Sequence, residues 1–291
     1  MKIRTAAKIN LALDVTGRLP DGYHLIESVF QSVGLYDDIT VELTDNSISV
    51  SCDVPEMFAQ ADPIPCDERN IAFKAAKLFF EENDLSCGCS IHIVKGIPSQ
   101  AGMGGGSTDA AAVLHCLNVL TDSGLTLEEL SFMGKKLGAD VPFCLAGGTA
   151  YVEGIGEKLV KLPDYDKRIL VIAKGTQGVS TGEAYARIDA LVSPVHPQTG
   201  KLVDSLKSAP DTAYMYFGNL FEQAVQLEEV DMLKSAMLNK GALKANMTGS
   251  GSAVFGLFDS REAADICALK LRNNGYFAQV CETVSKAYTL I

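Results

Sequence analysis

A glycine-rich segment between an apolar strand pattern and an alanine-rich helix pattern constrains the fold of this chain more than any other feature. Residues 90–94 have the pattern of a strand, residues 97–109 contain the glycines, and residues 110–114 favour a helix. Such a turn leaves backbone N–H groups unpaired at a helix N-terminus, which carries about half a positive charge. The segment therefore predicts a cradle for an anion, above all for phosphate.

The spacing of the glycines excludes two common phosphate loops. The dinucleotide-binding pattern needs a glycine at its sixth position, but the sixth residue is Ser107 when counted from Gly102 and Asp109 when counted from Gly104. The P-loop needs a Gly-Lys pair, and residues 97–109 contain no lysine. The segment is therefore a phosphate loop of a third kind or, alternatively, a flexible glycine turn without a ligand.

Composition limits the class of protein and its partners. The chain has 291 residues, enough for two domains, and its formal net charge of −11 without a basic stripe argues against a nucleic-acid partner. No apolar run approaches the length of a membrane span, and the N-terminus lacks the apolar core of a signal peptide, so we expect a cytoplasmic protein. The eight cysteines lack zinc-ligand spacing, and we expect small core residues rather than metal ligands or disulfides.

The order of the apolar patterns predicts an α+β protein. The pair at 45–46 predicts a hairpin into a strand at 47–52, and Thr126 with Glu129 predicts a capping box at the start of a helix that ends near residue 138. Further strands are expected near 5–15, 25–33, 39–44, 90–94, 149–152, 168–173, 253–258 and 276–283, and further helices near 69–83, 110–114, 181–190, 199–208, 217–227, 230–239 and 260–273.

Two charged residues are candidates for chemistry. The alternation over residues 5–15 places Lys8 and Asn10 on one face of a strand, where a lysine is either part of a site or simply solvated. Asp140 lies between a helix end and an apolar stretch, where a carboxylate tends to be paired or reactive. The alternative for Asp140 is a cap of the segment that follows it.

Two further segments are ambiguous by themselves. Residues 246–252 form a second loop of small residues before a strand pattern, as many turns do. Residues 21–24 begin with an ordinary Asp-Gly turn pair, and the two aromatic side chains after it are consistent with packing alone. The other histidines have no metal-ligand spacing, and we assign them to packing or surface positions: His92, His115 and His196.

Together these segments resemble the GHMP kinases, a superfamily of small-molecule phosphotransferases. The strand at residues 8–10 corresponds to the first motif of the superfamily, residues 98–108 to the second, and residues 248–252 to the third. Within the superfamily, residues 21–24 (Asp-Gly-Tyr-His) and 138–142 (Gly-Ala-Asp-Val-Pro) are most similar to the kinases of 4-diphosphocytidyl-2-C-methyl-D-erythritol, in the non-mevalonate isoprenoid pathway. The likeness spans essentially the whole chain.

The resemblance implies a two-domain α+β GHMP kinase fold with the active site between the domains. Residues 1–160 would form a domain of the ribosomal-protein-S5-domain-2-like kind, which carries the ATP loop and the catalytic residues. Residues 161–291 would form a ferredoxin-like α/β-plait domain. The implied partners are a small-molecule substrate, no nucleic acid and no membrane, and the implied assembly is a monomer or a weak homodimer.

The resemblance also implies the reaction, in which ATP phosphorylates the 2-hydroxyl of the methylerythritol unit of a CDP-linked substrate. Asp140 would take the hydroxyl proton, and Lys8 beside it would stabilise the transferring phosphoryl and keep Asp140 ionised. Tyr23 and His24 would hold the cytosine, and Tyr185 would close the other face of that ring. Asn10 completes the implied substrate-binding residues: Asn10, Tyr23, His24 and Tyr185.

The glycine loop would wrap the ATP phosphates. Ala101, Met103 and Thr108 differ from the residues common at these positions in the family, although Thr108 keeps a hydroxyl group. Magnesium is implied by the ATP chemistry and would be held largely by phosphates and water, with Ser107 as a contact. The implied ATP-binding residues are Pro98, Ser99, Gln100, Ala101, Gly102, Met103, Gly104, Gly105, Gly106, Ser107 and Thr108.

Two alternatives stay open at this point. Another GHMP kinase, acting on homoserine, mevalonate or a related alcohol, would give Tyr23 and His24 no base to hold. A nucleotide-binding regulator without turnover would need neither Lys8 nor Asp140 near a transferable phosphate.

Overall fold

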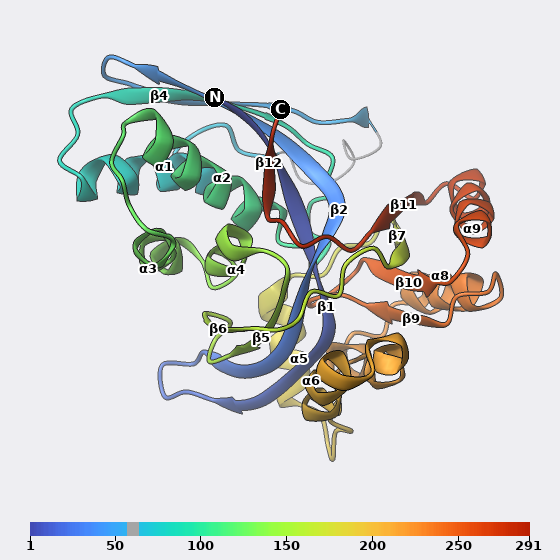
Figure 1. The fold of residues 1–291 in the computed structure, drawn as a ribbon. Helices are drawn as coiled ribbons and strands as arrows, with labels where there is room; N and C mark the ends of the chain where they lie inside the picture. Colours follow the sequence, from blue (N-terminus) through green and yellow to red (C-terminus); the bar gives the residue numbers. More distant parts are fainter. Residues whose placement is uncertain (57–63) are drawn as a thin grey trace.

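A pair of long antiparallel strands, β1 (Lys2–Arg18) and β2 (His24–Thr44), crosses the molecule (Figure 1). The computed structural model describes residues 1–56 and 64–291. The sequence predicted a break between two strands over residues 33–39, and this prediction was wrong, since β2 is continuous. β1 pairs with β2 on both sides of that region, and a bulge there absorbs the shift in register.

The first sheet has the strand order β12-β1-β2-β4-β3. β3 (Ile48–Asp53) pairs in parallel with β4 (Gly88–Val94), and β4 separates it from β2. The hairpin predicted at 45–46 was therefore wrong, because a local turn pattern cannot specify which later strand enters between its two neighbours. β5 (Thr149–Glu153) pairs with β2, and β6 (Lys158–Lys161) pairs with β5.

Helices of the first half pack on this sheet. α1 (Ile71–Glu82), α2 (Gly105–Leu120) and α3 (Leu127–Leu137) form one apolar cluster with β2, β3 and β4, and Figure 1 shows them together on one side of the sheet. α4 (Val141–Ala146) joins the same cluster. The predicted capping box of α3 is confirmed, because the Thr126 and Glu129 side chains each accept a backbone N–H of the other residue.

A second, fully antiparallel sheet follows in the second half, with the strand order β11-β7-β10-β9. Its strands are β7 (Ile169–Lys174), β9 (Lys244–Met247), β10 (Val254–Phe258) and β11 (Phe277–Glu282). Numbered along the chain, these strands lie in the order 4-1-3-2. This order matches the expected ferredoxin-like plait.

The helices of the second half surround this sheet and the lower part of β1 and β2 (Figure 1). One prediction for this region was wrong, because residues 217–227 do not form one helix. The chain there passes through a short strand and a single helical turn. The prediction failed because apolar side chains at helical spacing can also be buried by a compact, non-helical connection. The elements are α5 (Thr181–Asp189), α6 (Thr199–Ser208), the 3₁₀ helix η2 (Pro210–Tyr216), β8 (Gly218–Asn219), α7 (Phe221–Ala224), α8 (Glu228–Leu238) and α9 (Arg261–Asn273).

The second half also returns to the first sheet. β8 pairs in parallel with β1, and β12 (Tyr288–Leu290) pairs with β1 in antiparallel orientation, which brings the two chain termini close together (Figure 1). One apolar cluster joins side chains of both halves, among them Phe30 and Phe143 with Leu220 and Phe221. The domain boundary near residue 160 stays a prediction.

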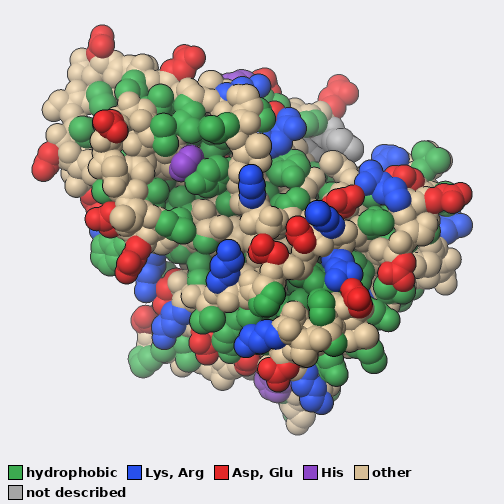
Figure 2. All heavy atoms as spheres, viewed as in Figure 1, with side chains coloured by type: hydrophobic (Ala, Val, Ile, Leu, Met, Phe, Trp, Pro, Cys, Tyr) green, Lys and Arg blue, Asp and Glu red, His purple; other side chains and the backbone are tan. Residues whose placement is uncertain are grey.

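The surface carries charges of both signs. On the face in Figure 2, Lys and Arg side chains lie interspersed with Asp and Glu side chains. Within residues 1–56 and 64–291, no helix is long and apolar enough to cross a membrane.

Candidate active site

A cleft of about 1080 Å³ collects the residues that the sequence analysis singled out. The first half contributes the middle of β1, the glycine loop and the turn before α4, and the second half contributes α5 and the loop after β9. The predicted residues that line this cleft are Lys8, Asn10, Tyr23, His24, Asp140, Tyr185 and all of residues 98–107.

Lys8 and Asp140 form an ion pair in this cleft. The Lys8 ammonium lies 3.3 Å from Asp140 Oδ2 and 4.5 Å from the centre of the Phe30 ring. The Lys8 side chain is 6% exposed, whereas that of Asp140 is 29% exposed. The lysine is thus not a solvated side chain of a strand face, and the carboxylate remains open to the cleft.

Asp140 occupies the N-cap position of α4 but does not cap it. Its side chain makes no capping hydrogen bond, and its backbone is helical, with φ −81° and ψ −17°. A capping aspartate has an extended backbone and accepts a hydrogen bond from the first turn. Of the two interpretations of Asp140, the structure therefore favours a paired carboxylate over a helix cap.

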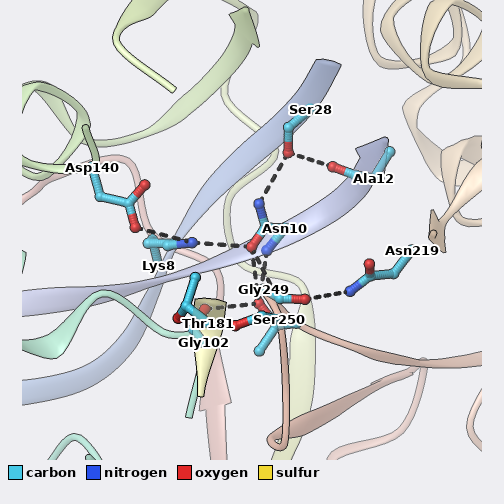
Figure 3. A network of polar contacts seen from close by, with 11 residues as sticks. Lys8, Asn10, Ala12, Ser28, Gly102, Asp140, Thr181, Asn219, Gly249 and Ser250 are labelled. Carbon is cyan, nitrogen blue, oxygen red and sulfur yellow. Dashed lines mark hydrogen bonds and ion pairs between the residues drawn. The ribbon is translucent and has the colours of Figure 1, made fainter. Parts of the chain in front are cut away.

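Asn10 is the centre of a buried polar network (Figure 3). Its side-chain oxygen accepts hydrogen bonds from Lys8 Nζ (3.1 Å), Thr248 Oγ1 (3.3 Å) and Gly249 N (3.0 Å). Its amide group donates to Ser28 Oγ at 3.0 Å. Asn10 is only 2% exposed. Its side chain thus orients Lys8 and joins β1 to the loop after β9, while its predicted substrate contact stays a prediction.

The glycine loop packs directly against that second loop. A Cβ at Gly102 would lie 2.3 Å from the carbonyl oxygen of Thr248, and a Cβ at Gly249 would lie 2.6 Å from Gly102 Cα. Gly102 also has a φ of +70°, in the left-handed region that favours glycine. Because only glycine permits this approach, the second and third predicted motifs form one continuous surface.

The helix after the loop presents its N-terminus to the cleft. α2 begins after Gly104, which has a left-handed φ of +72° and no side chain to cap the free N–H groups. A Cβ at Gly104 would lie 3.1 Å from Lys8 Cγ. Free N–H groups at a helix N-terminus bind anions, and here they lie next to Lys8.

The loop residues that depart from the family pattern expose little surface to the cleft. Ala101 and Met103 are 2% and 1% exposed and pack in the core beneath the loop. Thr108 lies outside the cleft lining, and its hydroxyl donates to the Ala6 carbonyl oxygen at 2.7 Å. The Thr108 side chain supports the loop from behind, and its predicted ATP contact stays a prediction.

An aromatic pair lies at the other end of the cleft. The His24 and Tyr185 rings stack with centres 4.5 Å apart, and His24 Nε2 donates to Asp189 Oδ1 at 2.7 Å. Burial and the nearby charge of Asp140 raise the pKa of Tyr185 to about 12, so its hydroxyl stays protonated at neutral pH. Tyr23 is 61% exposed at the rim. The His24 and Tyr185 rings are in direct contact, with no space for a base between them, so the predicted closing of the cytosine by Tyr185 stays a prediction. The exposed Tyr23 ring offers a flat face that suits a planar heterocycle.

Comparison with known proteins places the chain in a family. The model of the GHMP kinases N-terminal domain matches residues 70–148, and that of the GHMP kinases C-terminal domain matches residues 195–276. A 4-diphosphocytidyl-2-C-methyl-D-erythritol kinase of Clostridium botulinum (strain Eklund 17B / Type B) is 42% identical over 94% of this chain and 96% of that protein. The chain belongs to the GHMP kinases, in the family of 4-diphosphocytidyl-2-C-methyl-D-erythritol kinases.

Other relatives agree with this membership. The kinase of the same name from Clostridium tetani (strain Massachusetts / E88) is 40% identical over 98% of this chain and all of that protein. A solved 4-(cytidine 5'-diphospho)-2C-methyl-D-erythritol kinase is 28% identical, with a TM-score of 0.79 over 98% of this chain and 100% of the other. The structure of a homoserine kinase from Cytophaga hutchinsonii has a TM-score of 0.74 at 19% identity, over 100% of this chain and 97% of the other, and shares the fold.

The site of this GHMP kinase also contains charged residues that sequence reasoning missed. Asp189 holds His24 and forms an ion pair with Arg18 at 3.1 Å. Lys95 lines the cleft directly before the glycine loop. The sequence positions of Asp189 and Lys95 could have indicated that both residues belong to the site. Asp189 follows Tyr185 by one helical turn, and Lys95 lies just before the glycine loop. No sequence pattern indicated that these charges meet their partners.

Proposed function

We propose that this protein transfers the γ-phosphoryl group of ATP to the 2-hydroxyl of 4-diphosphocytidyl-2-C-methyl-D-erythritol. The observation that carries this proposal is the Lys8–Asp140 pair, 3.3 Å apart beside a helix N-terminus that offers free N–H groups. A base, a cation and an anion cradle in one cleft are the parts that phosphoryl transfer to an alcohol requires. The names of the relatives support the choice of alcohol.

Each member of the pair has its own role in this proposal. Asp140, the more exposed member, accepts the proton of the substrate hydroxyl as that oxygen attacks the γ-phosphorus. Lys8, held by Asn10 at 3.1 Å, stabilises the negative charge on the transferring phosphoryl oxygens. The backbone N–H groups of residues 104–107 bind the phosphates of ATP. These groups change little in position during the reaction, so catalysis rests on positioning and electrostatics.

The residues in the cleft fit a magnesium ion that is carried by the nucleotide. In the described part of the chain, no group of three or more His, Cys, Asp or Glu side chains is arranged to hold a metal. Mg²⁺ usually keeps several waters and binds through one or two protein oxygens plus substrate phosphates. Ser107 lines the cleft and would supply such an oxygen. The ion would neutralise phosphate charge when bound.

The cytidine end of the substrate is assigned to the aromatic pair. Tyr23, His24 and Tyr185 provide stacking surfaces and a ring nitrogen, and Asp189 fixes the orientation of the His24 ring. A substrate without a base would leave these groups without a partner. We also propose the cytoplasm as the site of action, because the eight cysteines are free thiols, which persist in a reducing compartment.

The test is ADP release by the purified protein with Mg-ATP and, in parallel, the CDP-linked methylerythritol, homoserine and mevalonate. Turnover with the cytidine compound alone is the expected result. Turnover with another alcohol would keep the kinase activity and overturn the substrate. ATP binding without turnover on any of the three would favour a nucleotide-binding regulator.

A further inference from the structure

We propose that Lys95, together with Asp37 and Asp109, holds the two ends of the glycine loop at the spacing that ATP requires. These three positioning residues take no part in the phosphoryl transfer itself and act through the loop, although Lys95 and Asp109 also lie in the wall of the cleft. The inference rests on the proposed function, in which this loop binds the phosphates of ATP.

A single ammonium group joins two carboxylates beneath the loop. Lys95 Nζ lies 2.5 Å from Asp37 Oδ2 and 2.8 Å from Asp109 Oδ2. The exposed fractions of the three side chains are 5%, 0% and 5%. Because the ammonium already serves two carboxylates, its role beneath the loop is to connect segments rather than to attract phosphate.

The three residues come from different segments that meet at the loop. Asp37 belongs to β2, Lys95 follows the last residue of β4, and Asp109 lies in the first turns of α2. Asp37 Oδ1 also accepts the backbone N–H groups of Gly96 (2.7 Å) and Ile97 (2.9 Å). The network therefore holds residues 96–97 at one end of the loop and Asp109 at the other.

The network also lies directly under the groups that would bind phosphate. A Cβ at Gly105, the first residue of α2, would lie 3.5 Å from Lys95 Nζ. A shift of the Lys95 ammonium would therefore displace the N-terminal turn of α2. The distance between that turn and Ile97 depends on the two ion pairs.

The composition of the network argues against a role in stability alone. Buried ion pairs contribute little net stability, and apolar side chains of similar volume often serve as well or better. Here two carboxylates share one ammonium, and Asp109 Oδ1 has no hydrogen-bond partner within the described residues. Because this network contributes so little to the stability of the fold, we infer that its geometry serves ATP binding.

The test compares Asp109→Ala and Asp109→Asn in the full-length protein. Asp109→Ala removes the link to α2, and we expect the Kd of a non-hydrolysable ATP analogue and the KM for ATP to rise about tenfold or more. The KM for the alcohol substrate should change less than about twofold, because the cytidine end of the cleft is separate. Asp109→Asn still offers an oxygen to Lys95 and should recover most of the ATP affinity.

A matched control and a second variant make the test decisive. Asp38→Asn alters the neighbouring carboxylate of β2, which pairs with Arg4 instead, and should leave the ATP affinity unchanged. The triple variant Asp37→Asn, Lys95→Met and Asp109→Leu removes all three charges together, so that no buried charge is left unpaired, and the amide oxygen at position 37 can still accept the N–H groups of Gly96 and Ile97. It should keep its Tm and still lose ATP affinity.

The outcomes separate this inference from the proposed function. Folded Asp109→Ala or triple-variant protein that binds the ATP analogue as tightly as the wild type would overturn the positioning role and leave the kinase function intact. A wild-type protein that does not bind the analogue would overturn the proposed function and this inference with it.

Discussion

At the scale of single residues, the ion pair of Lys8 and Asp140 is the arrangement with the most direct chemical consequence. The two side chains belong to positions 132 residues apart, on β1 and before α4, yet they lie 3.3 Å from each other. The pairing supplies a charged acceptor for a proton next to a fixed positive charge. Each side chain has its own testable role.

Asp140→Asn tests the proton acceptor. The amide keeps the shape of the side chain but cannot accept the hydroxyl proton, so we expect kcat to fall by a factor of about 10² to 10⁴. ATP binding should persist, because the carboxylate is not part of the phosphate loop. Single-turnover kinetics with an ATP-binding titration measure both quantities, and a variant with near wild-type kcat would exclude Asp140 as the base.

Asn10→Ala tests the buried network in Figure 3. Its removal leaves the N–H of Gly249 and the groups of Lys8 and Thr248 without their shared acceptor. We expect a loss of about 1–3 kcal/mol in the free energy of unfolding, together with reduced kcat because Lys8 loses its orientation. Denaturant unfolding measures the loss. The control is Asn83→Ala, which removes a single hydrogen bond to Phe79 at the end of α1.

At the scale of elements, the contact between the glycine loop and the loop after β9 determines the shape of the phosphate site. Gly102→Ala would place a methyl group 2.3 Å from the Thr248 carbonyl oxygen. We expect the two loops to separate and the KM for ATP to rise about tenfold or more, since misplaced contacts lose binding free energy steeply.

A second glycine offers a matched control for that prediction. Gly124 has a similar φ of +67° but nothing within 4 Å of an added Cβ. Gly124→Ala therefore carries the backbone strain without the clash, and should lower stability by about 1–2 kcal/mol while leaving ATP affinity unchanged. Equal effects of the two substitutions on ATP affinity would contradict the proposed loop contact.

The elements themselves were largely predictable. The capping box of α3, the strand–loop–helix order around the glycines and three strands of the second sheet follow from local periodicity and cap residues, whereas β9 was not predicted. The wrong predictions concern β2 and β3, whose extent and neighbours depend on the strands with which they pair. β2 is one strand because β1 pairs with it on both sides of residues 34–35, from His24 to Thr40. β3 is separated from β2 because β4 enters between them.

At the scale of the whole molecule, the substrate end of the cleft is shared between the two halves. Tyr185 on α5 stacks on His24 from the start of β2, and Phe221 contacts the Tyr185 ring from the side, with ring centres 5.0 Å apart. The shape of this end of the cleft therefore depends on how the second half is packed against β1 and β2.

Tyr185→Leu tests this shared surface. Loss of the ring should raise the KM for the CDP-linked substrate by about two- to tenfold, because one aromatic stacking surface contributes about 0.5–1.5 kcal/mol beyond its buried area. The KM for ATP should not change. Tyr276→Leu alters a partly buried aromatic residue packed elsewhere in the second half and serves as the control. Initial-rate kinetics with each substrate varied would contradict the assignment if both KM values rose together.

The sequence by itself determined the glycine loop between a strand and a helix, the order of most helices and strands, and the residue types that the proposed chemistry needs. These features depend on local periodicity, glycine spacing and cap residues, which are encoded within a few neighbouring positions. Only the tertiary structure decided that Asp140 pairs with Lys8 instead of capping α4, that Asn10 turns inward, and that Lys95 joins two carboxylates. Those contacts depend on which distant segments become neighbours when the sheets close, and no local pattern specifies that.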